Sequence, residues 1–104
     1  MDPWPSVRSF VERLNAVNGT GEHERAMRLM KLTEEIGEVM QAYIGVQGQN
    51  PRKGITHTDA DLVEELCDVV ITAMVALQTF TDDPAEALAA KIKAVDARYM
   101  QRDH

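Results

Sequence analysis

Two pairs of carboxylates are the residues in this sequence best suited to chemistry. Glu35 and Glu38 form the first pair, and Glu65 and Asp68 form the second. Residues three apart on an α-helix differ by about 60° in azimuth, so each pair projects from one helix face. Both pairs border an apolar stripe of their helix. If these two stripes pack together, the four carboxylates meet at the margin of a core.

A hard divalent cation would resolve the conflict among four such carboxylates, which repel one another and lose hydration on burial. Mg²⁺ and Mn²⁺ prefer oxygen ligands. Di-iron bundles need Glu-x-x-His units, and none of His23, His57 and His104 follows a glutamate by three residues. An all-oxygen site favours Mg²⁺ or Mn²⁺ and phosphate chemistry. Either pair alone is more typical of a solvated acidic helix face than of a metal site, whereas the two pairs together are equally consistent with both, so the metal site is a hypothesis.

The spacing of apolar residues predicts four helices to position these pairs, over residues 6–17, 22–46, 58–80 and 85–100. Glycine, asparagine, aspartate and proline separate them. Thr58 is expected to cap the third helix with Asp61 three residues later. No alternating pattern predicts a strand. The expected fold is all-α, a four-helix bundle-like protomer in one domain over residues 1–104.

The apolar positions of the second and third helices predict how the protomer packs and assembles. On the second helix they form one stripe, which we expect to face the core: Leu29, Leu32, Ile36, Val39, Met40 and Tyr43. On the third helix they cover an arc wider than one packing face requires. We therefore expect a homodimer or a dimer of dimers that buries the excess.

Composition excludes several classes of protein. The 104 residues include 11 Lys+Arg against 17 Asp+Glu, giving a net charge of −6. Nucleic-acid polymers and anionic membranes call for a basic face, so neither is an expected partner. Cys67 is the only cysteine, which excludes an internal disulfide, and we expect a buried, inert thiol. No targeting signal or membrane-spanning stretch is visible, so the expected location is the cytoplasm.

The motif Lys31-Leu32-Thr33-Glu34-Glu35-Ile36-Gly37-Glu38, followed by Glu64-Glu65-Leu66-Cys67-Asp68-Val69-Val70, resembles the MazG-like all-α nucleoside triphosphate pyrophosphohydrolases. The mark of that family is an ExxE pair, a variable insert and an ExxD pair. The resemblance covers the second to fourth helices. It implies hydrolysis of (deoxy)nucleoside triphosphates to monophosphate and pyrophosphate in nucleotide-pool housekeeping, with Mg²⁺ (or Mn²⁺) held by Glu35, Glu38, Glu65 and Asp68. It also implies dimers or dimers of dimers.

Such a reaction needs a base and cations for the phosphates. Glu34 or Glu64 could act in the outer shell of the metal or accept a proton from water, although an exposed helix charge is equally consistent for both. Lys31 shares the face of Glu35, where an i,i+4 ion pair is the alternative to phosphate binding. The further basic candidates are Arg52 and Lys53 in the loop and Lys93 and Arg98 on the last helix. Asp96 stands where the family often has Asn, which puts the last-helix contacts in doubt.

A function of another class is also consistent with the sequence. The chain could be a non-catalytic helical dimerisation or regulatory module that keeps its carboxylates as a vestigial or structural metal site. Binding of Mg²⁺, Mn²⁺ or a nucleotide would distinguish the enzyme from this module.

Overall fold

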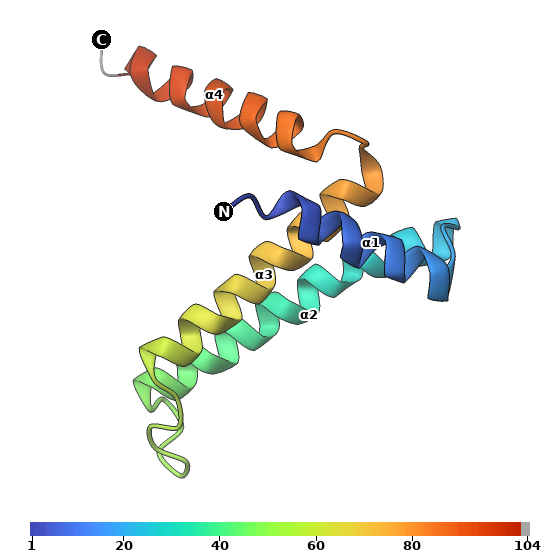
Figure 1. Cartoon of the computed structure of the whole chain (residues 1–104). Helices are drawn as coiled ribbons and strands as arrows, with labels where there is room; N and C mark the ends of the chain where they lie inside the picture. The colour runs from blue at the N-terminus through green and yellow to red at the C-terminus, as the bar shows by residue number, and fades with distance from the viewer. Residues whose placement is uncertain (103–104) are drawn as a thin grey trace.

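The computed structural model describes residues 1–102. It contains four helices, α1 (Trp4–Asn18), α2 (Glu22–Gln47), α3 (Asp59–Phe80) and α4 (Pro84–Arg102), and no strand among the described residues (Figure 1). The all-α prediction is confirmed, and the four helices match the predicted stretches to within two residues at each end. Within residues 1–102, no helix has both the length and the apolar content needed to cross a bilayer.

Helix α3 begins with the predicted capping box. The backbone N–H of Asp61 donates to Thr58 Oγ1 over 3.2 Å, and the Thr58 backbone N–H donates to Asp61 Oδ2 over 2.9 Å. The bonds from the Thr58 backbone and hydroxyl lower the pKa of the Asp61 carboxyl. This reciprocal pair satisfies two donors at the start of the helix that carries Glu65.

Gly45 allows the loop between α2 and α3 to fold back on α2. Its carbonyl oxygen accepts the backbone N–H of Thr56 over 3.0 Å and that of His57 over 3.4 Å. A Cβ at position 45 would collide with His57 Nδ1 and lie 2.6 Å from Thr56 Oγ1, closer than atoms of real side chains approach. A larger residue here would therefore displace the loop that sets the start of α3.

Helices α2 and α3 pack side by side as an antiparallel pair (Figure 1). The α2 residues buried in the structure form what we call the inner stripe: Arg28, Glu35, Ala42 and Gly45. Ala42 carries only a methyl group and so allows close approach of the helices, whereas Gly45 is covered by the loop after α2. The predicted packing stripe is wrong in part, because its members Leu29, Ile36, Met40 and Tyr43 are 46–52% exposed.

The outer helices pack very differently. Helix α1 packs on α3, and its Val7 and Val11 are buried. Helix α4 leaves α3 at Pro84 and extends away from the α2–α3 pair, touching α3 mainly at that corner (Figure 1). Within one chain, α4 therefore does not pack along the other three helices.

Arg28 links three parts of the fold by donating hydrogen bonds from a buried position. Its Nε donates to Glu24 Oε2 over 2.8 Å on α2, its Nη1 to Thr79 Oγ1 over 3.1 Å on α3, and its Nη2 to Asn15 Oδ1 over 2.9 Å on α1. The hydrogen bond from Arg28 lowers the pKa of the Glu24 carboxyl. Because Arg28 is only 6% exposed, water cannot easily replace these partners.

We expect Arg28→Met to lower the free energy of unfolding by about 2–4 kcal/mol, because it removes every donor while leaving the acceptors in place. Urea denaturation followed by far-UV circular dichroism measures the loss. Arg13→Met is the matched control, because Arg13 is exposed and lies 5.2 Å from the Phe10 ring centroid. Its expected loss is below about 0.5 kcal/mol. Equal losses in the two variants at the same protein concentration would contradict the role given to Arg28.

Candidate metal site

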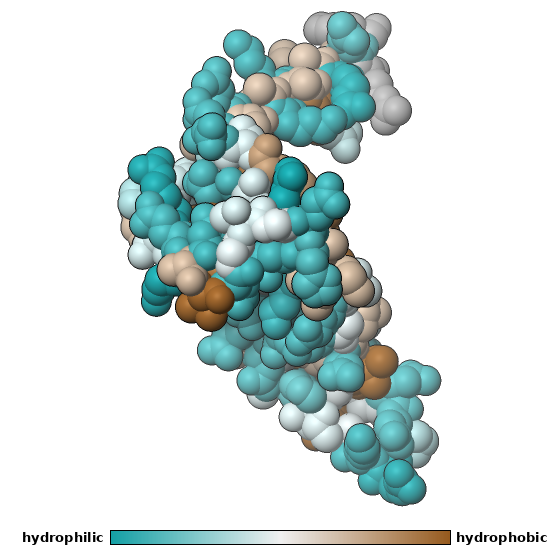
Figure 2. Space-filling view, turned by 90° about the vertical axis from the view of Figure 1, so that its right-hand side faces the viewer, coloured by the Kyte–Doolittle hydropathy of each residue, from teal (hydrophilic) through white to brown (hydrophobic). Residues whose placement is uncertain are grey.

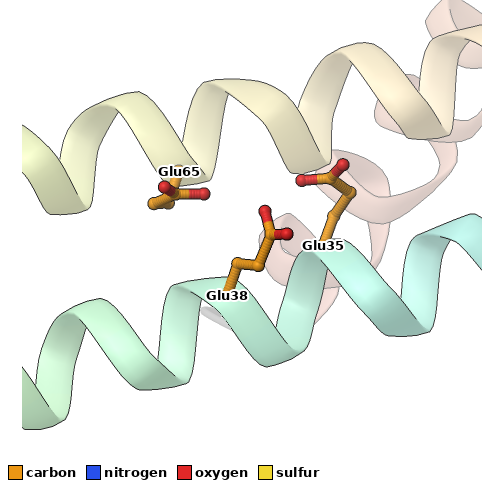
Figure 3. A group of neighbouring side chains, drawn as sticks. All are labelled: Glu35, Glu38 and Glu65. Atoms are coloured by element: carbon orange, nitrogen blue, oxygen red, sulfur yellow. The ribbon is translucent and has the colours of Figure 1, made fainter.

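Three of the four predicted carboxylates meet between α2 and α3. Glu35 and Glu38 of α2 and Glu65 of α3 each offer one oxygen, and these oxygens lie within 4.8 Å of one another. Figure 3 shows the three side chains lying in the space between the two helices. Oxygens bound to one Mg²⁺ at about 2.1 Å from the ion are at most about 4.2 Å apart. Small side-chain rotations would therefore bring the three oxygens to ligand distance.

The carboxylate cluster, defined as Glu35, Glu38 and Glu65, contains buried oxygens without partners. Glu35 is 8% exposed, and Glu38 and Glu65 are half-buried. Among the described residues, Glu35 Oε2 and Glu65 Oε2 are buried side-chain oxygens that accept no hydrogen bond. A buried polar atom without a partner costs about 1–3 kcal/mol. The donor set therefore fits a hard cation, which would supply the missing partner to both oxygens.

The charges around Glu35 also favour a bound cation. Burial raises the pKa of the Glu35 carboxyl, and the neighbouring Glu38 carboxyl raises it further. The Lys31 ammonium, with Nζ 3.5 Å from Glu35 Oε1, offsets part of this rise. The folded chain alone therefore holds the Glu35 proton more tightly than an exposed glutamate does. A cation that binds here competes with that proton.

Asp68, the fourth expected ligand, is not part of the carboxylate cluster. It lies on α3 three residues beyond Glu65, and its side chain is exposed. The rotation of about 60° between these positions turns Asp68 from the α2–α3 interface toward the surface. It therefore lies at the margin of the site on the same helix as Glu65.

Lys31 and Glu34 lie beside the cluster on α2. Lys31 Nζ is 3.4 Å from Glu34 Oε1, and both side chains are more than half exposed. The hydrogen bond to Glu34 raises the pKa of Lys31. The ion pair that the spacing predicted is the i,i+4 pair between Lys31 and Glu35, and it is present as well, with Nζ 3.5 Å from Oε1.

The other predicted phosphate ligands lie farther along the chain. Arg52 and Lys53 are exposed in the loop after α2, and Lys53 lines a pocket of about 310 Å³ together with Gln41, one helical turn beyond Glu38. Lys93 and Arg98 lie on α4, which extends away from the α2–α3 pair (Figure 1). A single chain does not bring these two α4 residues to the cluster.

A second pocket adjoins the cluster on the side of α1, and sequence analysis missed it. It has a volume of about 330 Å³ and is lined by Leu14, Asn18, Glu24, Met27, Arg28, Lys31, Ile71, Thr72 and Val75. Lys31 both lines this pocket and contacts Glu35, so it lies between the pocket and the cluster. The only signal in the sequence was the helical spacing of Ile71 and Val75, which does not reveal that α1 closes the pocket.

Cys67 and Gly37 belong to the two motifs but lie outside the carboxylate cluster. The prediction of a buried Cys67 is wrong, because its thiol is exposed. Cys67 follows Glu65 by two residues, which turns it about 200° around α3 from the face that meets α2. Nothing in the structure explains the glycine at position 37, where a Cβ would meet no atom within 4 Å.

No family model, curated protein or solved structure matches this chain. What the protein does is therefore inferred from its motifs and from the geometry of the site.

We expect Glu35→Gln to raise the melting temperature near neutral pH when a chelator is present, because the amide removes a buried charge. In the wild type, a raised folded-state pKa means that stability falls as pH rises from the ordinary glutamate pKa, about 4.3, through the folded-state value. The difference between variant and wild type should therefore vanish by about pH 4. Thermal unfolding over a pH series measures this.

The same assay distinguishes the cation site from a merely buried acid. Added Mg²⁺ or Mn²⁺ should raise the melting temperature of the wild type and of Glu64→Gln, whose exposed side chain lies outside the cluster. The cation should leave Glu35→Gln nearly unchanged. A Glu35→Gln variant that melts below the wild type in chelator near neutral pH would contradict the account of the cluster.

Proposed function

We propose that this protein hydrolyses (deoxy)nucleoside triphosphates to monophosphate and pyrophosphate with Mg²⁺, for which Mn²⁺ can substitute. The observation that carries the proposal is the convergence of Glu35, Glu38 and Glu65 from two helices around buried oxygens without hydrogen-bond donors. The resemblance of the two motifs to the MazG-like family supports the same reaction. The proposed role is removal of surplus or non-standard nucleotides from the pool.

The chain's residues have distinct roles in this proposal. Glu35, Glu38 and Glu65 hold the cation, and Asp68 joins them from the exposed margin by turning its side chain inward. The bound cation supplies positive charge that neutralises phosphate oxygens and acidifies water. Glu34, which pairs with Lys31 in the free chain and is released when Lys31 turns to the substrate, is the proposed base that takes a proton from the attacking water. Lys31 contacts a phosphate when the substrate displaces its present partners.

The pocket between α1, α2 and α3 is the proposed place for the nucleoside. Its volume of about 330 Å³ lies at the lower end for small-ligand pockets. Leu14, Met27, Ile71 and Val75 offer apolar contacts, while Asn18 and Thr72 offer polar ones. Because Lys31 lies between this pocket and the cluster, a nucleotide seated here would direct its phosphates past Lys31 toward the carboxylates.

Self-association belongs to the same proposal. Apolar side chains on α2 and α3 stay exposed in one chain, which favours a homodimer or a dimer of dimers. Lys93 and Arg98 are given no role at the site in this proposal, because α4 extends away from the α2–α3 pair (Figure 1). Arg52 and Lys53 would contribute from the loop beyond Glu38.

One observation favours the alternative, a non-catalytic dimerisation or regulatory module with a structural metal site. Asp68 lies outside the carboxylate cluster, so one expected ligand is not in place. Cation binding by calorimetry together with the absence of nucleotide turnover would support this module over the enzyme.

Glu38→Gln and Glu65→Gln should each lower kcat/KM for the best nucleotide by at least about 100-fold, because each removes one charged ligand. A nucleotide panel with chromatographic detection of monophosphate and pyrophosphate measures turnover. Glu64→Gln is the matched control and should retain activity near wild type. Far-UV circular dichroism should be unchanged in all three variants. Release of inorganic phosphate without any pyrophosphate would contradict the proposed reaction.

Val75→Phe should raise KM for nucleoside triphosphates about tenfold, because the added ring fills the pocket. Hydrolysis of inorganic triphosphate, which has no nucleoside, should be unaffected if the protein cleaves it. Val17→Phe, at a position 82% exposed near the end of α1, is the control and should leave both substrates unchanged. An unaltered KM for nucleotides in Val75→Phe would show that the nucleoside does not bind in this pocket.

A further inference from the structure

Helix α4 carries an apolar stripe that its own chain leaves uncovered. The α4 stripe consists of Leu88, Ile92, Val95 and Tyr99, whose spacing of four, three and four residues places them on one face. Leu88, Ile92 and Tyr99 are 40–61% exposed. Figure 1 shows α4 extending away from the α2–α3 pair, and in residues 1–102 only α3 packs against it appreciably, near the corner.

The α2–α3 pair carries a second uncovered surface, which we call the outer face. On α2 it comprises Leu29, Ile36, Met40 and Tyr43, and on α3 it comprises Val63, Leu66 and Val70, all 46–57% exposed. Around each helix axis, these residues are rotated by about 60–160° from the residues at the α2–α3 interface. The sense of the rotation, viewed along the chain direction, is the same in both helices. Because the helices are antiparallel, this rotation turns both sets to the same side of the pair. Lys31 and Glu38 are rotated the other way.

The exposed area of the whole chain is too large for a compact monomer. A folded protein of 11.6 kDa exposes about 5,800 Å², whereas this chain exposes 7919 Å². Its radius of gyration is 17.3 Å, against about 13 Å for a compact chain of this length. The excess of about 2,100 Å² matches the area that one subunit buries in an obligate dimer.

Hydrogen bonds at the corner before α4 direct the helix away from its own pair. Thr81 N–H donates to Leu77 O over 3.1 Å, and Asp83 N–H donates to Thr81 Oγ1 over 3.2 Å. The Arg25 guanidinium lies 4.4 Å from the Phe80 ring centroid, and Pro84 is buried. For α4 to lie on the outer face of its own chain, this corner would have to rearrange.

We propose that two copies of this chain exchange α4, so that the α4 stripe of each copy packs on the outer face of the other. The lengths agree, since 19 residues of α4 span about 28 Å and the outer face from Leu29 to Tyr43 spans about 21 Å. A two-fold axis makes the two contacts identical and closes the assembly. The proposal deepens the self-association suggested above. It leaves the carboxylate cluster open, because the outer face lies on the other side of the pair.

Sedimentation of the full chain tests the exchange. The wild type should be a dimer, and Ile92→Glu should weaken dimerisation by about 100-fold or more because it places a charge in the middle of the α4 stripe. Ala90→Glu is the matched control and should remain dimeric, because position 90 lies on the opposite side of α4. A monomeric wild type, or equal effects of the two variants, would overturn the proposal.

Disulfide trapping tests which surfaces meet. In a Cys67→Ser background, chains with Leu66→Cys are mixed with chains with Ile92→Cys, and mild oxidation should give a covalent heterodimer. Ala90→Cys in place of Ile92→Cys should give much less. A chain that carries both Leu66→Cys and Ile92→Cys and closes only within itself would show that α4 folds back, which overturns the exchange.

The two proposals fail separately in these experiments. A dimer that traps as expected but has no pyrophosphohydrolase activity would support the exchange and refute the proposed reaction. An active, cation-binding monomer would overturn the exchange and the self-association, while it would support the proposed reaction. Mn²⁺ titration of Ile92→Glu completes the comparison, because the carboxylate cluster should still bind the cation when dimerisation is weakened.

Discussion

The constraint on which this structure depends is the burial of charged side chains between α2 and α3. The inner stripe of α2 places Arg28 and Glu35 where a helix pair normally places apolar residues. Arg28 finds acceptors on three helices, whereas Glu35 finds only Lys31 as an opposite charge and keeps an oxygen without a donor. Two buried charges on one stripe thus have different consequences. Arg28 stabilises the fold by itself, whereas Glu35 leaves a buried oxygen that a cation would satisfy.

Helical periodicity was enough to predict the four helices, the capping box and the shared face of Glu35 and Glu38. It also predicted that Glu65 would meet them, because consecutive helices with apolar stripes pack together. It failed where α2 and α3 each carry two surfaces. Leu29, Ile36 and Tyr43 were assigned to the core because they are apolar, yet they are exposed and the small residue Ala42 is buried instead. Hydropathy does not distinguish packing within one chain from packing between chains.

The other features that the sequence did not predict depend on contacts among three helices. The Arg28 network and the pocket beside Lys31 both require α1 to cross the α2–α3 pair, and no spacing within one helix encodes that crossing. The position of Asp68 was missed for a simpler reason. Three residues along α3 suffice to move a side chain from the interface to the surface, so a motif that places two acids on one face does not place them at one depth.

The two faces of the α2–α3 pair also separate two tasks that would otherwise conflict. In the proposed reaction, a chain with a net charge of −6 repels the triphosphate, so the acidic side would have to stay accessible to cations before a phosphate could approach. The apolar outer face, by contrast, gains stability only by being covered. With Lys31 and Glu38 turned to one side and Leu66 and Val70 to the other, assembly can bury the apolar side without closing the acidic one. Coupling between the two sides is then confined to the residues between the helices. Among these, Glu35 is the buried acid of the carboxylate cluster, and its protonation depends on how closely α3 is held against α2.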